Sequence, residues 1–581
     1  MSQMHNPFAE ERCRTVFEVG KGVATLYIVS FMLMLWLPAL VWHVSMAAQG
    51  KWAETPAAKL VSWRPAQGDI VHHLRSVEKL TDNAPYSVAL RQGTQAMLLT
   101  DASEGNMKTY LGWDGWLFYH PDMRALSGYG PIKPEPFSVM KDPELGKVPE
   151  TRDLIIEYAA QLKERGIDLL LVPVPLKPMI YNEFIAPNST STWLTHPDAP
   201  AFYKLLREHG VDVLDFTQDF SKLRGERKHV YYLEANSQNR DIAKETEENL
   251  KLKKEAFLKQ DTHWTPEAMR LAAEKVADHV KSKYPQALGP GFRTIRAVDG
   301  VLRSSMGDLV KLLDLKEPEQ FFEEEEQFLG VIGEGTRDKH SPVVLLGDSF
   351  VNIYDDPGLG FENPEKPDQL IQAGFAQHLS LLLQRPLDVI AKNGQGSTEV
   401  RKELAQRPDE EVRAKKLVIW VIAARDVLLS TNAARASNIT WARVKFSEPK
   451  KDAGGAGEPT VVAPSTAEVV VVEAKLTEKS ANQEVNGTPY TNALHTATYD
   501  IENVVSGTLS AKQVLGVQWT FKDKQVQPSA NFAVGRKYRL TLVPWETKKD
   551  KEPAYSNYNL NDESLALELD RWFVEKAEEV K

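Results

Sequence analysis

Continuous runs of apolar residues in the middle of the chain predict buried β-strands. Four such runs occupy residues 167–174 (IDLLLVPV), 343–347, 387–391 (LDVIA) and 417–423 (LVIWVIA). Runs without polar alternation are typical of strands that are buried on both faces of a parallel sheet. Helical patterns lie between them: residues 151–165 place their apolar side chains on one face, and Thr265-Pro266-Glu267 opens a further helix. Strands alternating with helices predict a three-layer α/β/α domain over residues 106–435.

The pattern changes near the C-terminus. Residues 450–460 (KKDAGGAGEPT) have the composition of a linker, which we assign to 436–465. Stretches with partial polar–apolar alternation then follow, at 468–476, 493–505, 513–521 and 538–545. They predict a small β-rich sandwich or barrel module over residues 466–581. Its last part, residues 562–580, places apolar residues on one side and predicts a C-terminal amphipathic helix.

The N-terminal pattern is different again. Residues 23–44 (VATLYIVSFMLMLWLPALVWHV) contain no charged side chain and are long enough to cross a bilayer as a transmembrane helix. Arg12, Arg14 and Lys21 precede this segment, which favours a cytoplasmic N-terminus (1–22) and an extracytoplasmic remainder. The alternative is a signal peptide cleaved near Ser45-Met46-Ala47, which would leave a soluble periplasmic protein. Residues 45–105 have weak periodicity and are interpreted as a helical stalk.

Composition and the absence of common motifs argue against several classes of function. The formal net charge is −10 and there is no long basic stripe, so the sequence predicts no nucleic-acid binding. A single cysteine excludes an internal disulfide. The sequence has no P-loop, no dinucleotide fingerprint after a strand, no HExxH and no CxxC, so we expect no cofactor and no metal.

The candidate chemistry begins at VVLLGDSF, where a predicted strand ends in a turn that carries Ser349. Val351 stands where the nucleophile elbow G-x-S-x-G has its second glycine, which disfavours a standard α/β-hydrolase. A serine hydroxyl becomes a good nucleophile only when a base accepts its proton and a third group orients that base. Asp261-Thr262-His263-Trp264 supplies such a pair just before a capped helix. The alternative is that Asp261 and His263 only brace this loop.

The ordered set of motifs resembles the SGNH (GDSL-type) hydrolases. LLGDSF resembles the first block of that superfamily, NGQGS at residues 393–397 the second, and VIWVIAARDVL the third, although Arg425 replaces the usual asparagine. The Asp/His block normally comes last, whereas here it precedes the serine. This permuted order, with LGWDGWLFY at residues 111–119 and LLLVPVPLKPMIY at 169–181, is similar to the alginate O-acetyltransferase family with its AlgJ/AlgX-like SGNH domain.

The resemblance implies roles for particular residues. Ser349 would be the nucleophile, His263 the general base and Asp261 its orienter. The oxyanion donors would be the Ser349 amide and an amide among Asn393, Gly394, Gln395 and Gly396. Arg425 could hold an oxyanion or a sugar carboxylate, or could pair with Asp426 or another acid. Tyr354 could line the site or pack in the core, and Asp348 is expected to stabilise the turn.

The resemblance also implies an activity: acetyl transfer through an acyl-serine to the hydroxyls of an alginate-like exopolysaccharide. The implied partners are the polysaccharide acceptor and a membrane-bound O-acyltransferase that supplies acetyl groups. Two alternatives stay open, a carbohydrate esterase that uses the same residues and a non-catalytic glycan-binding scaffold. In the β-rich module Trp519 and Trp545 are candidates for stacking on sugar, although we expect at least one of them to be core. Trp113 and Trp116 are weaker candidates for the same role.

Overall fold

The computed structural model divides the chain into two compact parts, residues 1–102 and 103–581. It describes residues 21–62, 70–133, 149–226, 255–289, 294–362, 370–446, 469–480, 482, 485, 492–509, 511–545, 548, 559–561 and 571–580. Arg12, Arg14 and most of the predicted linker lie outside these residues.

The described residues of the first part are helical. Helix α2 (Lys21–Ala48) is 28 residues long, contains Pro38 and has no buried residue, and it is long and apolar enough to cross a membrane. It is compatible with the predicted anchor and equally with a signal peptide. The helices that follow are α3 (Pro56–Ser62), α4 (Ile70–Asp82) and α5 (Pro85–Met97), and Leu98–Ala102 forms a final wide turn.

The α/β domain is built on a five-stranded parallel sheet in the order β4-β3-β9-β7-β8. The four predicted strands form β3 (Asp168–Val174), β7 (Val343–Gly347), β8 (Asp388–Ala391) and β9 (Leu417–Ala423). Every residue of β7 and β9 is buried, which is the physical reason that both strands are apolar throughout. Strand β4 (Asp212–Val213) was not predicted, because a two-residue edge strand is too short to show a periodic pattern.

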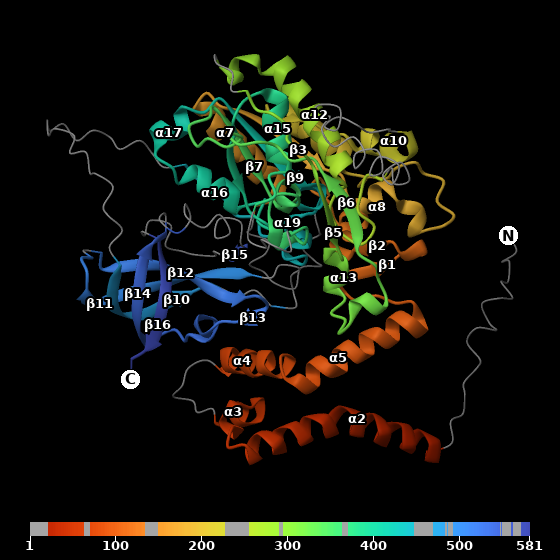
Figure 1. The fold of residues 1–581 in the computed structure, drawn as a ribbon, viewed down its shortest axis with the longest axis vertical. Coiled ribbons are helices and arrows are strands. Elements are labelled where there is room, and N and C mark those ends of the chain that lie inside the picture. The colour runs from red at the N-terminus through yellow and green to blue at the C-terminus, as the bar shows by residue number, and fades with distance from the viewer. Residues whose placement is uncertain are drawn as a thin grey trace, which may run out of the picture. The chain divides into compact units, whose positions relative to one another are not determined.

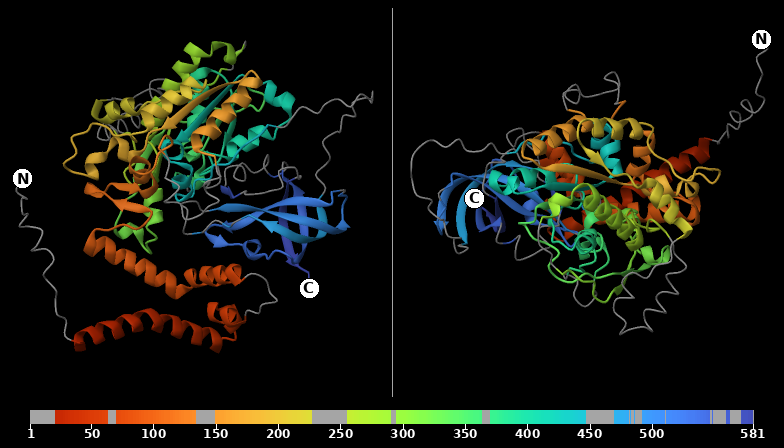
Figure 2. Two further views of the ribbon diagram at one scale, coloured as in Figure 1. Left: turned by 180° about the vertical axis from the view of Figure 1, so that it is seen from behind. Right: turned by 90° about the horizontal axis from the view of Figure 1, so that it is seen from above.

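Helices lie on both faces of this sheet (Figures 1 and 2). The helices that connect successive strands are α9 (Ala199–Glu208), α15 (Phe375–Leu383) and α16 (Glu399–Ala405). With this strand order, the right-handed crossovers that parallel strands nearly always adopt put α9 and α16 on one face and α15 on the other. Helix α7 (Thr151–Glu164) packs beside α9, and α12 (Pro266–Lys283) packs beside α15. The predicted three-layer α/β/α architecture is confirmed.

Short elements complete this domain. Two antiparallel hairpins pair β1 (Thr109–Leu111) with β2 (Leu117–Tyr119), and β5 (Val301–Ser305) with β6 (Glu325–Leu329). The short helices are α6 (His120–Ser127), α8 (Lys177–Ile180), α10 (Thr217–Glu226), α13 (Asp308–Leu312), α14 (Ser349–Asn352), α17 (Asp409–Arg413), α18 (Ala424–Leu428) and α19 (Thr431–Arg435).

The C-terminal module is a β-barrel with its own apolar core. Its sheet has the order β13-β12-β16-β14-β10-β11-β15, and an additional pairing of β11 with β12 closes it. The closure removes the exposed edges that an open sheet would leave. The strands are β10 (Val470–Lys479), β11 (Ala493–Ser506), β12 (Gln513–Lys522), β13 (Gln525–Val526), β14 (Lys537–Pro544), β15 (Asn559–Asn561) and β16 (Arg571–Glu579).

The predicted C-terminal helix is wrong over its second half. Residues 571–579 form β16, which lies between β12 and β14 and pairs with both. Phe573 and Val574 are buried there, so tertiary pairing overrides a sequence pattern that also fits a helix. The first half of the prediction, residues 562–570, lies outside the described residues.

Candidate active site

The site lies at the carboxyl ends of the parallel strands, where α/β folds assemble their ligand sites. Ser349 is the first residue of α14, directly after β7 and Asp348. The Asp348 carboxylate accepts hydrogen bonds from the Phe350 amide (2.9 Å) and the Ala423 amide (3.2 Å). It therefore fixes the turn that presents Ser349 and ties that turn to the end of β9, in agreement with the turn-stabilising role expected from the sequence.

The loop Asp261–Trp264 is held over this turn by its own packing. Thr265 caps α12 by accepting a hydrogen bond from the Ala268 amide. Trp264 is fully buried and packs edge-on against Phe350, with ring centroids 5.3 Å apart. The indole thus anchors the loop next to the residue that follows Ser349.

Three side chains from these two segments form a hydrogen-bonded row. The Ser349 Oγ lies 2.8 Å from His263 Nε2, and His263 Nδ1 lies 2.6 Å from Asp261 Oδ1. A carboxylate only accepts, so Nδ1 carries a proton and Nε2 of the neutral ring is free to accept the Ser349 proton. Asp261 Oδ1 also accepts the His263 amide at 3.0 Å, which holds the two residues in one local turn. All three side chains are at least 96% buried.

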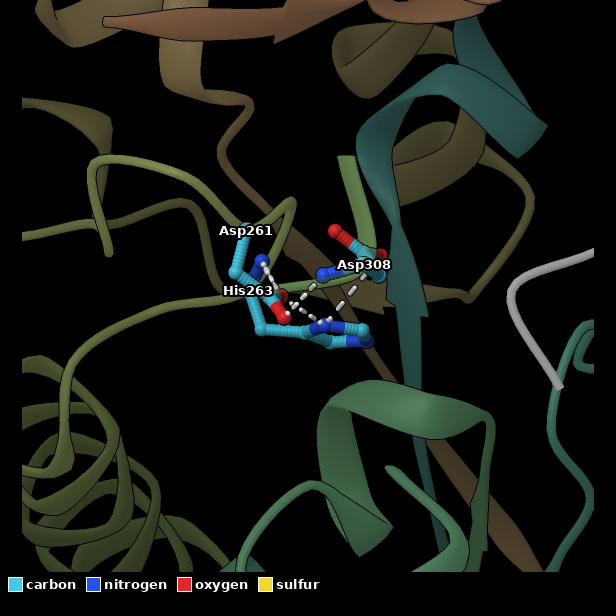
Figure 3. A group of neighbouring side chains, drawn as sticks. All are labelled: Asp261, His263 and Asp308. Atoms are coloured by element: carbon cyan, nitrogen blue, oxygen red, sulfur yellow. Dashed lines mark hydrogen bonds and ion pairs between the residues drawn. The ribbon is translucent and has the colours of Figure 1, made fainter. Parts of the chain in front are cut away.

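A fourth residue, Asp308 at the start of α13, joins this row (Figure 3). Its amide donates to Asp261 Oδ2 at 2.8 Å, and its carboxylate accepts from the Thr262 amide at 2.7 Å and the Thr262 hydroxyl at 2.5 Å. Gly307 makes this approach possible: its φ is +83°, and a Cβ there would lie 2.3 Å from the Gln260 carbonyl oxygen. Asp308 was not identified from the sequence. Its only local signal is a Gly-Asp pair that opens a short helix.

Burial and mutual charge interactions shift the pKa values of Asp261, His263 and Asp308. Burial alone would lower the pKa of His263, but the carboxylates of Asp261 and Asp308 outweigh it and raise that pKa. The pKa of Asp308 is raised by burial and by the nearby Asp261 charge. Burial also opposes ionisation of Asp261, yet the hydrogen bonds and charge of His263 prevail and lower its pKa. The site therefore favours an ionised Asp261 beside an imidazole that readily accepts a proton.

The potential ligand atoms of Asp261, His263 and Asp308 all lie within 4.8 Å of one another, a spacing that could hold a metal ion. However, both Asp261 oxygens and both Asp308 oxygens already accept hydrogen bonds from N–H or O–H groups. A cation would have to displace these donors. The arrangement fits a hydrogen-bond network for proton transfer better than a metal centre.

A family model described as the SGNH hydrolase-like domain of the acetyltransferase AlgX matches residues 110–235 and 234–424, more than half of the chain. The chain belongs to this family. The match spans the Asp261–Trp264 loop, Ser349 and the loop after β8.

Several solved structures are similar to this chain, but their sequence identities and TM-scores are low. The O-acetyltransferase domain of Pseudomonas putida AlgJ is 19% identical, with a TM-score of 0.37, over 55% of this chain and 91% of that one. Pseudomonas aeruginosa AlgX is 16% identical, with a TM-score of 0.34, over 64% and 71% of the two chains. Bacillus cereus PatB1 with a sulfonyl adduct is 11% identical, with a TM-score of 0.29, over 56% and 97%. No curated protein matches the sequence. The family model alone carries the assignment.

The loop after β8 lies next to the Ser349 turn. A Cβ on Gly396 would lie 3.0 Å from the Asp348 Cβ, so glycine lets the two segments meet. The Asn393 side chain is buried between Asn352, which donates to it, and Asp356, to which it donates. Trp420 Nε1 donates to the Gly396 carbonyl at 2.9 Å, which anchors this loop of the AlgX-like domain from beneath.

Arg425 pairs with an acid, one of the two alternatives that the sequence left open. Its Nη1 donates to Asp122 at 2.8 Å, and its Nε lies 3.6 Å from Asp426. Its guanidinium also lies 5.9 Å from the Phe350 ring centroid, so this charge stands close to Ser349. Asp122, at the start of α6, was not identified from the sequence, because 303 residues separate it from Arg425.

Lys177 was also missed as a site residue, although its segment was part of the resemblance. Its ammonium group is buried beneath the loop and donates to the Leu117 carbonyl (2.7 Å) and the Lys259 carbonyl (3.2 Å). It joins the β2 strand to the chain just before Asp261. Burial lowers the pKa of Lys177 to about 8.

Several candidate ligand contacts are structural instead. Tyr354 is fully buried and its hydroxyl donates to the Trp264 carbonyl at 2.7 Å, so it packs in the core. Trp116 is buried against Tyr181, whereas Trp113 is 61% exposed. In the barrel, Trp545 is buried and stacks on Phe573, which fits the expectation that at least one tryptophan is core. Trp519 is partly buried and packs edge-on against the same ring.

Proposed function

We propose that this protein is an O-acetyltransferase that works through an acyl-serine on Ser349. The observation that carries the proposal is the row Asp261–His263–Ser349, with contacts of 2.6 and 2.8 Å, inside an AlgX-family domain. Such a row is recognised by geometry and not by chain order, so a base that precedes its nucleophile is no obstacle.

The first half-reaction forms the acyl-enzyme. His263 Nε2 accepts the Ser349 proton while Oγ attacks the carbonyl carbon of an acetyl ester. The negative charge that develops on the carbonyl oxygen is held by the Ser349 amide and an amide of the loop from Asn393 to Gly396. Collapse of this intermediate breaks the ester bond, and the His263 imidazolium returns its proton to the leaving oxygen. Asp261 keeps the ring in the required tautomer throughout.

The second half-reaction releases the acetyl group. A sugar hydroxyl gives its proton to His263 and attacks the acetyl carbonyl, and Oγ leaves and takes that proton back. Transfer instead of hydrolysis requires that a sugar hydroxyl be bound at the acyl-serine and that water be excluded from it. We propose an alginate-like exopolysaccharide as acceptor and a membrane-bound O-acyltransferase as the source of acetyl groups. Helix α2 supports an inner-membrane anchor, and Arg12, Arg14 and Lys21 before the apolar segment favour a catalytic domain outside the cytoplasm.

The test uses the full-length chain in detergent with a chromogenic acetyl ester, with and without a uronate oligosaccharide. We expect ester cleavage and an oligosaccharide that gains one acetyl mass, and we expect Ser349→Ala to abolish both. Ser380→Ala, which changes a buried serine on α15, is the matched control and should retain activity. Free acetate without acetylated sugar would instead assign the esterase. Full activity of Ser349→Ala would refute the acyl-serine.

A further inference from the structure

We infer that Asp308 is a positioning residue of this site: it locks the Asp261–His263 turn and adds a second negative charge to the imidazole. The catalytic consequence of this inference rests on the proposed function, whereas the effect of Asp308 on the titration of His263 does not. Asp308 comes from a different segment than Asp261 and His263 (Figure 3), and Ser349 comes from a third.

Hydrogen bonds tie Asp308 to the Asp261–Trp264 loop. Asp308 and the loop exchange hydrogen bonds in both directions: the Asp308 amide donates to Asp261, and Thr262 donates its amide and its hydroxyl to the Asp308 carboxylate. Thr262 lies between the two proposed catalytic residues. Its two bonds to Asp308 therefore fix the backbone that aims Asp261 and His263 at each other. A fourth hydrogen bond, from the Leu309 amide to the Gln260 carbonyl at 3.2 Å, extends the same contact.

Asp308 also acts on His263 through its charge. Asp308 Oδ2 lies 3.8 Å from His263 Nδ1, and both side chains are buried. A charge at this distance, shielded from water, stabilises the imidazolium that forms when His263 accepts a proton. Asp261 orients the ring through a direct hydrogen bond to Nδ1, and the Thr262 hydroxyl lies 3.3 Å from the same nitrogen. Asp308 makes no such bond to the ring and acts through its charge and through Thr262.

The other charged groups around His263 do not replace this contribution. They come from α6, the α14 turn, α8 and α18, namely Asp122, Asp348, Lys177 and Arg425. Arg425 opposes protonation of His263, and its charge is largely matched by its own partner Asp122. Lys177 faces the carboxylates of the loop from beneath. The two carboxylates that dominate at His263 are Asp261 and Asp308.

The inference makes different predictions for three variants. Asp308→Asn keeps the shape but removes the charge, so His263 should titrate at a lower pH and the acid limb of the pH–rate profile should move the same way. Thr262→Val removes the hydroxyl but keeps the charge, so turnover should fall while the limb stays in place. Asp308→Glu should restore the limb towards the wild-type position. At a pH above the limb, Asp308→Asn should retain turnover within about tenfold, against a loss of ~10⁴-fold for Asp261→Asn.

The decisive measurement is the titration of His263 in the full-length chain, followed by NMR of ¹³C-labelled histidine rings and assigned with His263→Gln. This readout needs no activity, so loss of the proposed function would not remove it. An unchanged His263 titration in folded Asp308→Asn would overturn the inference even if Ser349 proves essential. If Asp308→Asn does not fold, the wild-type titration decides: a midpoint at or below the ordinary histidine value of about 6.5 would overturn the inference.

Discussion

Arg401 on α16 offers a direct test of how the candidate oxyanion loop is held. Its guanidinium is fully buried and lies over three rings, 5.0 Å from Trp441 and 5.4 Å from both Tyr158 and Trp420. Nε donates to the Ser397 carbonyl at 2.6 Å, and Nη2 donates to the Ala442 carbonyl at 3.1 Å. Burial lowers its pKa to about 10, so it stays charged at neutral pH.

The variant Arg401→Met fills a similar volume but leaves the buried Ser397 carbonyl and the partly buried Ala442 carbonyl without this donor. An unpaired buried carbonyl costs about 1–3 kcal/mol and a partly exposed one costs less, which gives about 1–4 kcal/mol for the two. For a domain of about 340 residues the entropy of unfolding is about 0.7 kcal/mol/K, so we expect the melting temperature to fall by about 1–6 °C. The loop should also lose one of its anchors, although Trp420 and the Asn393 side chain continue to hold it. A displacement of about 1 Å at the oxyanion donors would lower turnover by on the order of 10²-fold.

Thermal unfolding of the full-length chain, followed by tryptophan fluorescence, measures the change in melting temperature, since Trp420 and Trp441 lie next to Arg401. Acetyl-ester turnover measures the effect on the loop. The matched control is Arg435→Met on α19, which changes an exposed arginine and should shift the melting temperature by less than about 1 °C. If Arg401→Met has the melting temperature of the control and keeps wild-type turnover, Arg401 does not hold the loop that follows β8.

Three further predictions concern the base, the core and the anchor. The raised pKa of His263 means that its imidazole becomes neutral only above the ordinary histidine range, so kcat/KM should rise with pH and reach half its maximum above about 6.5; a midpoint below this value would contradict the charge arrangement. Tyr354→Phe should lower stability by about 1–3 kcal/mol in thermal unfolding because it orphans the Trp264 carbonyl, and an increase in KM with unchanged stability would instead place Tyr354 at the substrate. Intact-mass analysis of the membrane fraction should find the segment Lys21–Ala48 retained, whereas a mature chain that starts near Ala47 would show cleavage.

The sequence determined the parts of this protein that depend on local pattern. Strands β7 and β9 are apolar at every position because both of their faces are covered, so the sequence alone predicts their burial. Asp261 and His263 are only two residues apart, and their pairing within one turn could be expected from that spacing. The order of the motifs was specific enough to indicate the family that the family model then matched.

Only the tertiary structure decided which distant residues complete the site. Ser349 is 86 residues from His263, and Asp308 is 47 residues from Asp261, so their contacts arise from the sheet order and the crossovers and leave no periodic signal. The same holds for the choice between the two roles of Arg425, which depended on the position of Asp122. At the C-terminus the pattern of residues 571–579 fits a helix or a strand, and pairing with β12 and β14 selected the strand. Local pattern fixes which face of an element is buried, whereas the partner on that face is set by packing energy between segments far apart in the chain.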